Sequence, residues 1–243
     1  MSPDYENLIN SLIKDGYLRT PAIIDAFKAI DRADFVSDEY KNDAYVNAPL
    51  PIGFEQTISQ PLVVAFMIEL LEPKAGEKIL DVGAGSGWQT AILSYIVSQN
   101  DSEHSGKIIG LERIPELANM AEKNISKYDF FAPAQKVLDE ETATEKDIVL
   151  NPIKGIAKII KADGSKGYKK EAPYDKIIAG ASAMGDVPID WRKQLKIGGR
   201  IVAPVGQSIV VIDKTGKGKY SGKEFFGFSF VPLIRDQKME DRG

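Results

Sequence analysis

Three glycines at alternate positions, Gly83, Gly85 and Gly87, stand between an apolar stretch and a run with helical spacing. The preceding residues 79–82 read Ile-Leu-Asp-Val, which favours a buried strand. Glycine adopts positive φ in tight turns and lets the backbone approach a ligand closely. A strand, a glycine turn and a helix N-terminus in this order form a cradle for a nucleotide-type cofactor. An ordinary strand-to-helix turn is the alternative interpretation.

The spacing of the glycines narrows the choice of cofactor. The dinucleotide fingerprint advances three positions from its second glycine to its third, whereas this chain advances two. No Gly-Lys-Ser or Gly-Lys-Thr follows, so the pattern is not a P-loop. What remains is Asp-x-Gly-x-Gly-x-Gly, beginning at Asp81, which is the pattern of enzymes that bind S-adenosylmethionine.

An acidic residue, Glu112, stands at the end of the next expected strand, residues 107–111. A carboxylate in that position can accept hydrogen bonds from a ribose diol, as the acidic residue after the second strand does in dinucleotide folds. The alternative is a surface acid that stabilises the N-terminus of a helix beginning at Pro115. We favour ribose binding, because the spacing agrees with the glycine pattern.

Composition excludes several classes of function. The chain has 243 residues, a net charge of −4, one histidine and no cysteine. It therefore has no disulfide, thiolate metal site or cysteine nucleophile, and the charge argues against a general nucleic-acid binder. His104 lies in a polar stretch expected to be a loop, so we expect neither a Ser-His-Asp triad nor a zinc site. Without a signal-peptide pattern or an apolar membrane stretch, we expect a cytoplasmic protein with no membrane partner.

Strands and helices are expected to alternate along most of the chain. This alternation predicts an α/β fold, a doubly wound Rossmann-like sheet with helices on both faces and an antiparallel C-terminal edge. The expected strands are residues 79–82, 107–112, 155–162, 174–180 and 200–205, followed by a hairpin of 208–213 and 225–234. The expected helices of this part are 115–128 and 187–195, and Gly198-Gly199 is expected to turn into the strand at 200.

The N-terminal part has a different pattern. We expect a helix with an apolar stripe at residues 8–13, a second helix capped by Thr20, and an irregular stretch at 31–40. The prolines and glycine of 47–61 rule out a regular central strand or helix there, and an apolar helix follows from Leu62. We interpret 1–243 as one domain, with a helical and substrate-capping segment (1–78), a cofactor-binding core (79–243) and an inserted surface excursion at 131–152.

The stretch from Pro49 to Pro61 reads Pro-Leu-Pro-Ile-Gly, two further residues, then Gln-Thr-Ile-Ser-Gln-Pro. It resembles the protein-L-isoaspartate O-methyltransferase family. The likeness spans most of the chain in the family's order and includes the blocks at 32–36, 79–88, 111–117, 163–167, 172–175, 198–206 and 230–233. The chain departs from the family at Leu62 and Val63, where histidine or tyrosine and then methionine are usual, and at Asn47, where an acid is common.

The resemblance implies a function and a catalytic residue. The family methylates isoaspartyl residues of damaged proteins with S-adenosylmethionine and releases S-adenosylhomocysteine. Its proposed active-site serine corresponds to Ser59, whose hydroxyl would hold the acceptor carboxylate together with free amides of the following helix start. From the sequence alone we favour Ser59 as a helix N-cap, and the resemblance reverses that preference, although one serine could serve both roles. Asp163 is implied to accept a hydrogen bond from the adenine amino group, and is otherwise a plain turn residue.

Taken together, these arguments give a full set of expected site residues. The expected cofactor-binding residues are Gln56, Thr57, Ile58, Ser59, Asp81, Gly83, Gly85, Gly87, Glu112, Arg113, Asp163 and Gly164. The expected substrate-binding residues are Pro51, Ile52, Ile58, Ser59, Val205 and Gly206. The expected partners are isoaspartyl proteins and peptides, without nucleic acid or metal, and the protein is expected to be a monomer.

The acceptor chemistry agrees with this composition. A carboxylate, with an ordinary pKa near 4, is already ionised at pH 7 and needs no general base, whereas a phenol or amine acceptor usually does. Two rival functions stay open. One is a small-molecule methyltransferase on the same scaffold, and the other is a non-catalytic relative that binds S-adenosylmethionine.

Overall fold

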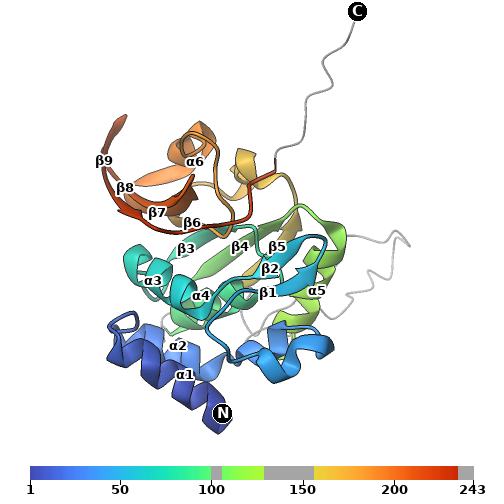
Figure 1. Cartoon of the computed structure of the whole chain (residues 1–243). Coiled ribbons are helices and arrows are strands. Elements are labelled where there is room, and N and C mark those ends of the chain that lie inside the picture. The colour runs from blue at the N-terminus through green and yellow to red at the C-terminus, as the bar shows by residue number, and fades with distance from the viewer. Residues whose placement is uncertain (100–105, 129–155, 235–243) are drawn as a thin grey trace, which may run out of the picture.

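A seven-stranded sheet runs through the middle of the molecule (Figure 1). The computed structural model describes residues 1–99, 106–128 and 156–234. The strand order is β5-β4-β3-β6-β7-β8-β9, in which β5 to β7 are parallel and β8 and β9 are antiparallel. The strands are β3 Lys78–Val82, β4 Lys107–Glu112, β5 Ala157–Lys161, β6 Tyr174–Ala179, β7 Leu195–Val205, β8 Ser208–Gly216 and β9 Lys219–Phe226. The predicted doubly wound α/β fold with an antiparallel C-terminal edge is confirmed.

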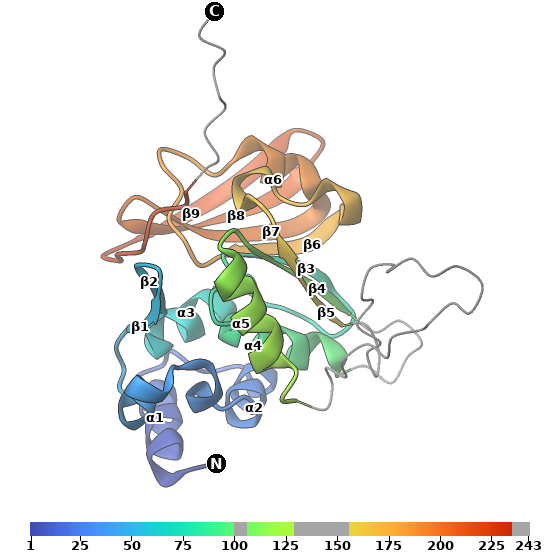
Figure 2. The same cartoon turned by 90° about the vertical axis from the view of Figure 1, so that its right-hand side faces the viewer.

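Helices cover both faces of this sheet (Figure 2). Successive residues of a strand point to opposite faces, so Ile79 and Leu80 belong to different core clusters. One face packs against α3 (Pro61–Leu71), α4 (Trp88–Ser98) and α5 (Pro115–Ile125), and the other against the short α6 (Ile189–Gln194). The helices α1 (Pro3–Lys14) and α2 (Pro21–Ala29) form a further layer outside α4.

The predicted side-chain cap at the start of α2 is not made. Thr20 occupies the N-cap position, but its side chain makes no capping hydrogen bond. Its hydroxyl instead donates to Glu69 of α3, at 2.8 Å, and the amides of Arg19 and Thr20 donate to the same carboxylate at 2.7 and 2.8 Å. Glu69, 49 positions from Thr20, therefore holds the residues that precede α2, a contact that the local sequence could not indicate.

Between α2 and α3 the chain is more regular than expected. The stretch predicted to be irregular contains two 3₁₀-helices, Arg32–Phe35 and Asp38–Asp43, so that prediction was wrong. The strands β1 (Leu50–Gly53) and β2 (Gln56–Ile58) pair as a small antiparallel sheet of their own. Residues 47–60 thus contain no helix and no strand of the central sheet, as predicted, and α3 begins at Pro61.

The second strand of the C-terminal hairpin has different bounds from the prediction. This strand, β9, is Lys219–Phe226 and not 225–234. The sequence pattern missed it because almost every side chain of β9 is exposed, so no apolar alternation marks the strand. Gly198 and Gly199 lie inside β7, which begins at Leu195 immediately after α6, so the predicted turn was also wrong. Residues 227–234 instead cross toward the loop after β6, where Ser182 forms a bridge with Pro232.

The remaining predictions differ by a few residues or fall outside the described part of the chain. The helix predicted at 115–128 ends at Ile125, the strand predicted at 155–162 is described over Ala157–Lys161, and the helix predicted at 187–195 is Ile189–Gln194. His104 and the predicted excursion 131–152 lie outside the described residues. In the described ranges 1–99, 106–128 and 156–234, no helix combines the length and the apolar character that crossing a membrane requires.

Candidate active site at the carboxyl ends of the strands

Two adjoining pockets open where β3, β4 and β6 end. Strand order reverses between β3 and β6, and such a switch point is where doubly wound sheets bind ligands. The larger pocket, with about 560 Å³ of empty space, is lined by Ile52, Gln56, Thr57, Ile58, Ser59, Val64, Gly83, Ala84, Gly85, Ser86, Trp88, Gln89, Glu112, Gly180, Ala181 and Val231. The smaller, with about 460 Å³, is lined by Gln56, Val82, Gly83, Leu111, Glu112, Arg113, Ile114, Ala162, Gly164, Ala181, Pro232, Leu233 and Ile234.

The glycine turn lies along both pockets. All three of its glycines have positive φ, with values of 80° at Gly83, 56° at Gly85 and 93° at Gly87. A Cβ on Gly87 would lie 3.1 Å from the Cα of Ala121, so this glycine lets α4 begin in close contact with α5. Gly83 and Gly85 line the larger pocket, whereas Gly87 lines neither pocket. The structure thus gives Gly87 a packing role.

Glu112 is the buried charge at the junction of the two pockets. Its Oε2 accepts a hydrogen bond from the Gly85 amide and its Oε1 one from the Ile114 amide, both at 2.9 Å. Ile114 is the N-cap residue of α5, so the carboxylate also serves the helix start, which was the alternative interpretation. An ionised carboxylate has about four acceptor positions, which leaves acceptor capacity for the hydroxyls of a ligand.

Asp81 lies beneath the pocket and not in its wall. The side chain is completely buried and accepts hydrogen bonds from Gln89 Nε2, at 2.7 Å, and Thr90 Oγ1, at 2.6 Å. Burial raises the pKa of Asp81 to about 6, although both hydrogen bonds lower it. Gln89 lines the larger pocket, so Asp81 orients a pocket residue without reaching the pocket itself.

The segment 56–59 forms another wall of the larger pocket. Gln56, Thr57, Ile58 and Ser59 all line it, as does Ile52 of β1, whereas the exposed Pro51 does not. The N-cap residue of α3 is Gln60, so the interpretation of Ser59 as the cap was wrong. The Ser59 hydroxyl makes no hydrogen bond to any other described residue, which leaves it available at the pocket wall.

The first residues of α3, which follow the N-cap residue Gln60, offer no free amides up to Val64. Pro61 has no N–H, the Leu62 amide donates to Asn47 Oδ1 at 3.0 Å, and the amides of Val63 and Val64 donate to the Gln60 carbonyl at 3.0 and 3.1 Å. The expectation that amides of the helix start hold the acceptor carboxylate was therefore wrong for residues 61–64. Asn47, where the family commonly has an acid, is the residue that caps α3.

The remaining expected residues divide between the pockets and their surroundings. Arg113 and Gly164 line the smaller pocket, and the Gly164 carbonyl accepts a hydrogen bond from the indole of Trp191 at 2.8 Å. Asp163 lines neither pocket, and its carboxylate accepts the Ser165 amide at 2.9 Å and pairs with Lys166 at 3.3 Å. Val205 and Gly206 line neither pocket and contact the loop after β6 through Ala183.

Sequence reasoning missed two walls of the site. One is the turn after β6, Gly180 and Ala181, and the other is the C-terminal segment that includes Val231 and Leu233. The two are joined, because the Ser182 amide donates to the Val231 carbonyl and the Leu233 amide to the Ser182 carbonyl, both at 2.8 Å. Pro232 was the available signal, since a proline disfavours the regular strand that we predicted over it.

The arrangement defines a class of protein. Within residues 1–99, 106–128 and 156–234, no group of three or more His, Cys, Asp or Glu side chains could hold a metal ion. The site combines a glycine turn, a buried carboxylate after the second parallel strand and a pocket at the switch point. These are the features of a doubly wound α/β enzyme that binds a nucleotide-type cofactor.

Comparison with known proteins identifies the family. The family model described as Protein-L-isoaspartate(D-aspartate) O-methyltransferase matches residues 3–238. Protein-L-isoaspartate O-methyltransferase of Methanopyrus kandleri is 38% identical over 97% of this chain and 93% of its own, and that of Staphylothermus marinus is 37% identical over 96% and 95%. The chain therefore belongs to the protein-L-isoaspartate(D-aspartate) O-methyltransferase family, a family of enzymes.

A solved structure has the same fold. The crystal structure of a putative protein-L-isoaspartate O-methyltransferase from Plasmodium falciparum, in complex with S-adenosyl-L-homocysteine, superposes with a TM-score of 0.76. It is 22% identical in sequence, and the match covers 97% of this chain and all of that one. At this identity the likeness concerns the fold.

Proposed function

We propose that this protein transfers a methyl group from S-adenosylmethionine to the α-carboxylate of L-isoaspartyl residues in damaged proteins and peptides. The observation that carries the proposal is the wall formed by residues 56–59, which faces the glycine turn across one pocket. The Gln-Thr-Ile-Ser block is the most specific part of the resemblance, and it lies where an acceptor would meet the cofactor. Membership of the family supports the same reaction.

The residues of the two pockets fit the cofactor. Glu112 would hold the ribose hydroxyls, since it is a buried acceptor shared by both pockets. The apolar side chains of Leu111, Ile114, Ala162 and Leu233 would hold the adenine ring in the smaller pocket. When bound, S-adenosylmethionine supplies an electrophilic methyl group on a sulfonium.

The protein's own part in the reaction is alignment and exclusion of water. The acceptor carboxylate is ionised at pH 7, so none of the residues around it has to remove a proton. The free hydroxyl of Ser59 would donate a hydrogen bond to one carboxylate oxygen and turn the other toward the cofactor. The apolar side chains of Ile52, Val64 and Trp88 line the same space and would keep water from the reacting groups.

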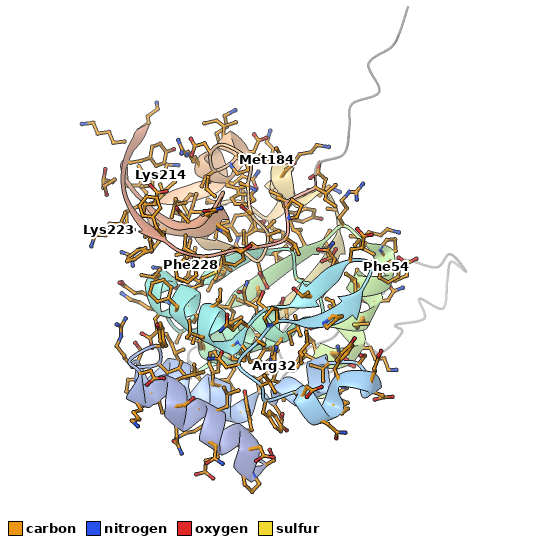
Figure 3. All side chains as sticks on the ribbon, viewed as in Figure 1. Arg32, Phe54, Met184, Lys214, Lys223 and Phe228 are labelled. Carbon is orange, nitrogen blue, oxygen red and sulfur yellow. The ribbon has the colours of Figure 1, made fainter. Side chains whose placement is uncertain are left out.

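The two rival functions differ from this proposal in the acceptor of the methyl group or in whether any transfer takes place. A small-molecule methyltransferase would need a closed acceptor site, whereas the larger pocket is bounded by an exposed hairpin with Phe54 near its tip (Figure 3). A non-catalytic relative would bind the cofactor without transfer. A single-turnover assay with labelled S-adenosylmethionine and an isoaspartyl peptide separates the proposal from both rivals. We expect a base-labile labelled ester on the peptide. Cofactor binding without label in the peptide would contradict the proposal.

Two further proposals concern the protein as a whole. We propose that it is a monomer and that it acts in the cytoplasm on isoaspartyl proteins and peptides. A monomer suits a site that one chain provides from its own loops, and the cytoplasmic location rests on the sequence. Light scattering coupled to size-exclusion chromatography tests the first proposal, and localisation of a tagged chain tests the second.

A further inference from the structure

Arg32 is a buried cation that has no carboxylate partner among the described residues. Its side chain is completely buried, and Figure 3 places it in the interior, between the N-terminal segment and the helices α3 and α4. No carboxylate among the described residues forms an ion pair with it. All its hydrogen bonds go to backbone carbonyls instead, those of Ala44, Val46, Ala48 and Ser59, at 2.6, 3.3, 2.9 and 3.2 Å.

The guanidinium touches two walls of the larger pocket. Nη2 donates to the carbonyl of Ser59, and Cζ lies 5.4 Å from the ring centroid of Trp88. Ser59 and Trp88 both line the pocket, one in the segment 56–59 and the other at the start of α4. The planar fork of an arginine can hold several acceptors in a fixed geometry, which a lysine cannot. Arg32 therefore links Ser59 of one wall to Trp88 at the start of α4.

The hydrogen bond to Ser59 also orients a peptide group. The Ser59–Gln60 peptide bond is trans, so its N–H points opposite to the carbonyl that Arg32 holds. The Gln60 amide makes no hydrogen bond to any other described residue. Burial lowers the pKa of Arg32 to about 10, so the guanidinium is charged at pH 7 and polarises the peptide group that it holds.

We propose that Arg32 is a positioning residue for methyl transfer, which fixes the Ser59–Gln60 peptide group so that the Ser59 hydroxyl and the Gln60 N–H are presented to the acceptor carboxylate. This inference rests on the proposed function. The Gln60 N–H would be the second hydrogen-bond donor to the carboxylate, a role that the occupied amides of residues 62–64 cannot fill.

Arg32→Lys tests the proposal, because it keeps the positive charge and loses the fork. We expect kcat for an isoaspartyl peptide to fall about 10- to 100-fold, since a displacement of about 1 Å can cost that much. The dissociation constant of S-adenosylhomocysteine should stay within about twofold of wild type, because Arg32 contacts neither Glu112 nor a residue that lines the smaller pocket. Arg200→Lys is the matched control. Arg200 is a forked, partly buried arginine on β7 that pairs with Asp213 and Glu72, and it should lose thermal stability without losing kcat.

A double mutant separates positioning from general stability. If Arg32 acts through Ser59, Arg32→Lys combined with Ser59→Ala should lose less than the product of the two single losses. A wild-type kcat in Arg32→Lys, or losses that multiply, would overturn the role of Arg32. Arg32→Gln, which keeps two N–H donors, replaces the lysine variant if that variant does not fold. Failure of the wild-type protein to methylate the peptide would instead overturn the proposed function.

Discussion

Ser59 is the residue on which the acceptor chemistry depends most. Its hydroxyl lines the larger pocket without a partner among the described residues, and it is not needed to cap α3. Removing it should therefore cost turnover and little else. We expect Ser59→Ala to lower kcat roughly 10- to 150-fold, the value of a hydrogen bond to a charged group. The dissociation constant of S-adenosylhomocysteine should be nearly unchanged.

A second serine provides the comparison for this experiment. Ser98 ends α4 and donates to the Tyr95 carbonyl at 2.7 Å, far from the lining of both pockets. Ser98→Ala should turn over like the wild type. If Ser59→Ala behaves in the same way as Ser98→Ala, the hydroxyl of Ser59 takes no part in the reaction.

Glu112 should control cofactor affinity. Replacing its carboxylate by an amide removes a charged acceptor from paired donors, which costs about 1.5–3 kcal/mol of binding free energy. We expect Glu112→Gln to raise the dissociation constant of S-adenosylhomocysteine roughly 10- to 150-fold by calorimetric titration. Thermal unfolding has to be measured as well, because the same carboxylate holds the Gly85 and Ile114 amides.

The exposed Glu116, in the first turn of α5, lines neither pocket and is the control for Glu112. Glu116→Gln should change neither the binding of S-adenosylhomocysteine nor the turnover. An unchanged dissociation constant in a folded Glu112→Gln protein would mean that Glu112 only stabilises the glycine turn and the start of α5.

At the scale of elements, β3 and α4 are joined by a carboxylate that is costly to ionise. The pKa of Asp81 is about 6 in the folded protein against 3.8 ordinarily. A raised folded-state pKa gives stability that is fully present below pH 3.8 and is lost as the pH rises through 6. Asp81→Asn lacks this titration. The free energy of unfolding of wild type minus that of Asp81→Asn should therefore fall by about 3 kcal/mol between pH 3.5 and pH 7. Denaturant titrations that give the same difference at both pH values would contradict it.

The sequence predicted the elements that carry strong apolar patterns. The strands β3, β4 and β6 and their parallel pairing followed from buried runs bounded by glycine and proline, and the glycine turn predicted where the pocket lies. The edge strand β9 has no buried face, so its position could not be read from periodicity. The hydrogen bonds of Glu69 to the residues before α2 and the capping of α3 by Asn47 are long-range contacts, which local patterns do not contain.

The sequence likewise predicted only part of the candidate site. Residues on the strand ends, such as Gly83 and Glu112, lie at the pockets, because the carboxyl ends of parallel strands share one edge. Asp81 does not, since alternate residues of a strand face different layers and its side chain turns to α4. The walls at Ala181 and Val231 come from two distant segments joined by backbone hydrogen bonds, and no spacing in the sequence marks that contact.

At the scale of the whole molecule, the N-terminal helices share a core with the sheet. Phe27 of α2 contacts Trp88 of α4 edge-to-face, with 5.6 Å between ring centroids, and both belong to the core cluster that contains Ile79 of β3. We therefore propose that 1–243 is one domain and expect a single cooperative transition in calorimetry, with equal calorimetric and van't Hoff enthalpies. A separate early transition that leaves cofactor binding intact would contradict one domain.

The central claim is that the acceptor is recognised by the position of its carboxylate. The most direct test compares two peptides of identical sequence, one with L-isoaspartyl and one with L-aspartyl at the same place. The misplaced methylene shifts the carboxylate relative to the methyl donor, and such a displacement can cost about 10²-fold in rate. We predict a kcat/KM at least about 100-fold higher for the isoaspartyl peptide than for its twin. Equal values of kcat/KM for the two peptides would contradict the account.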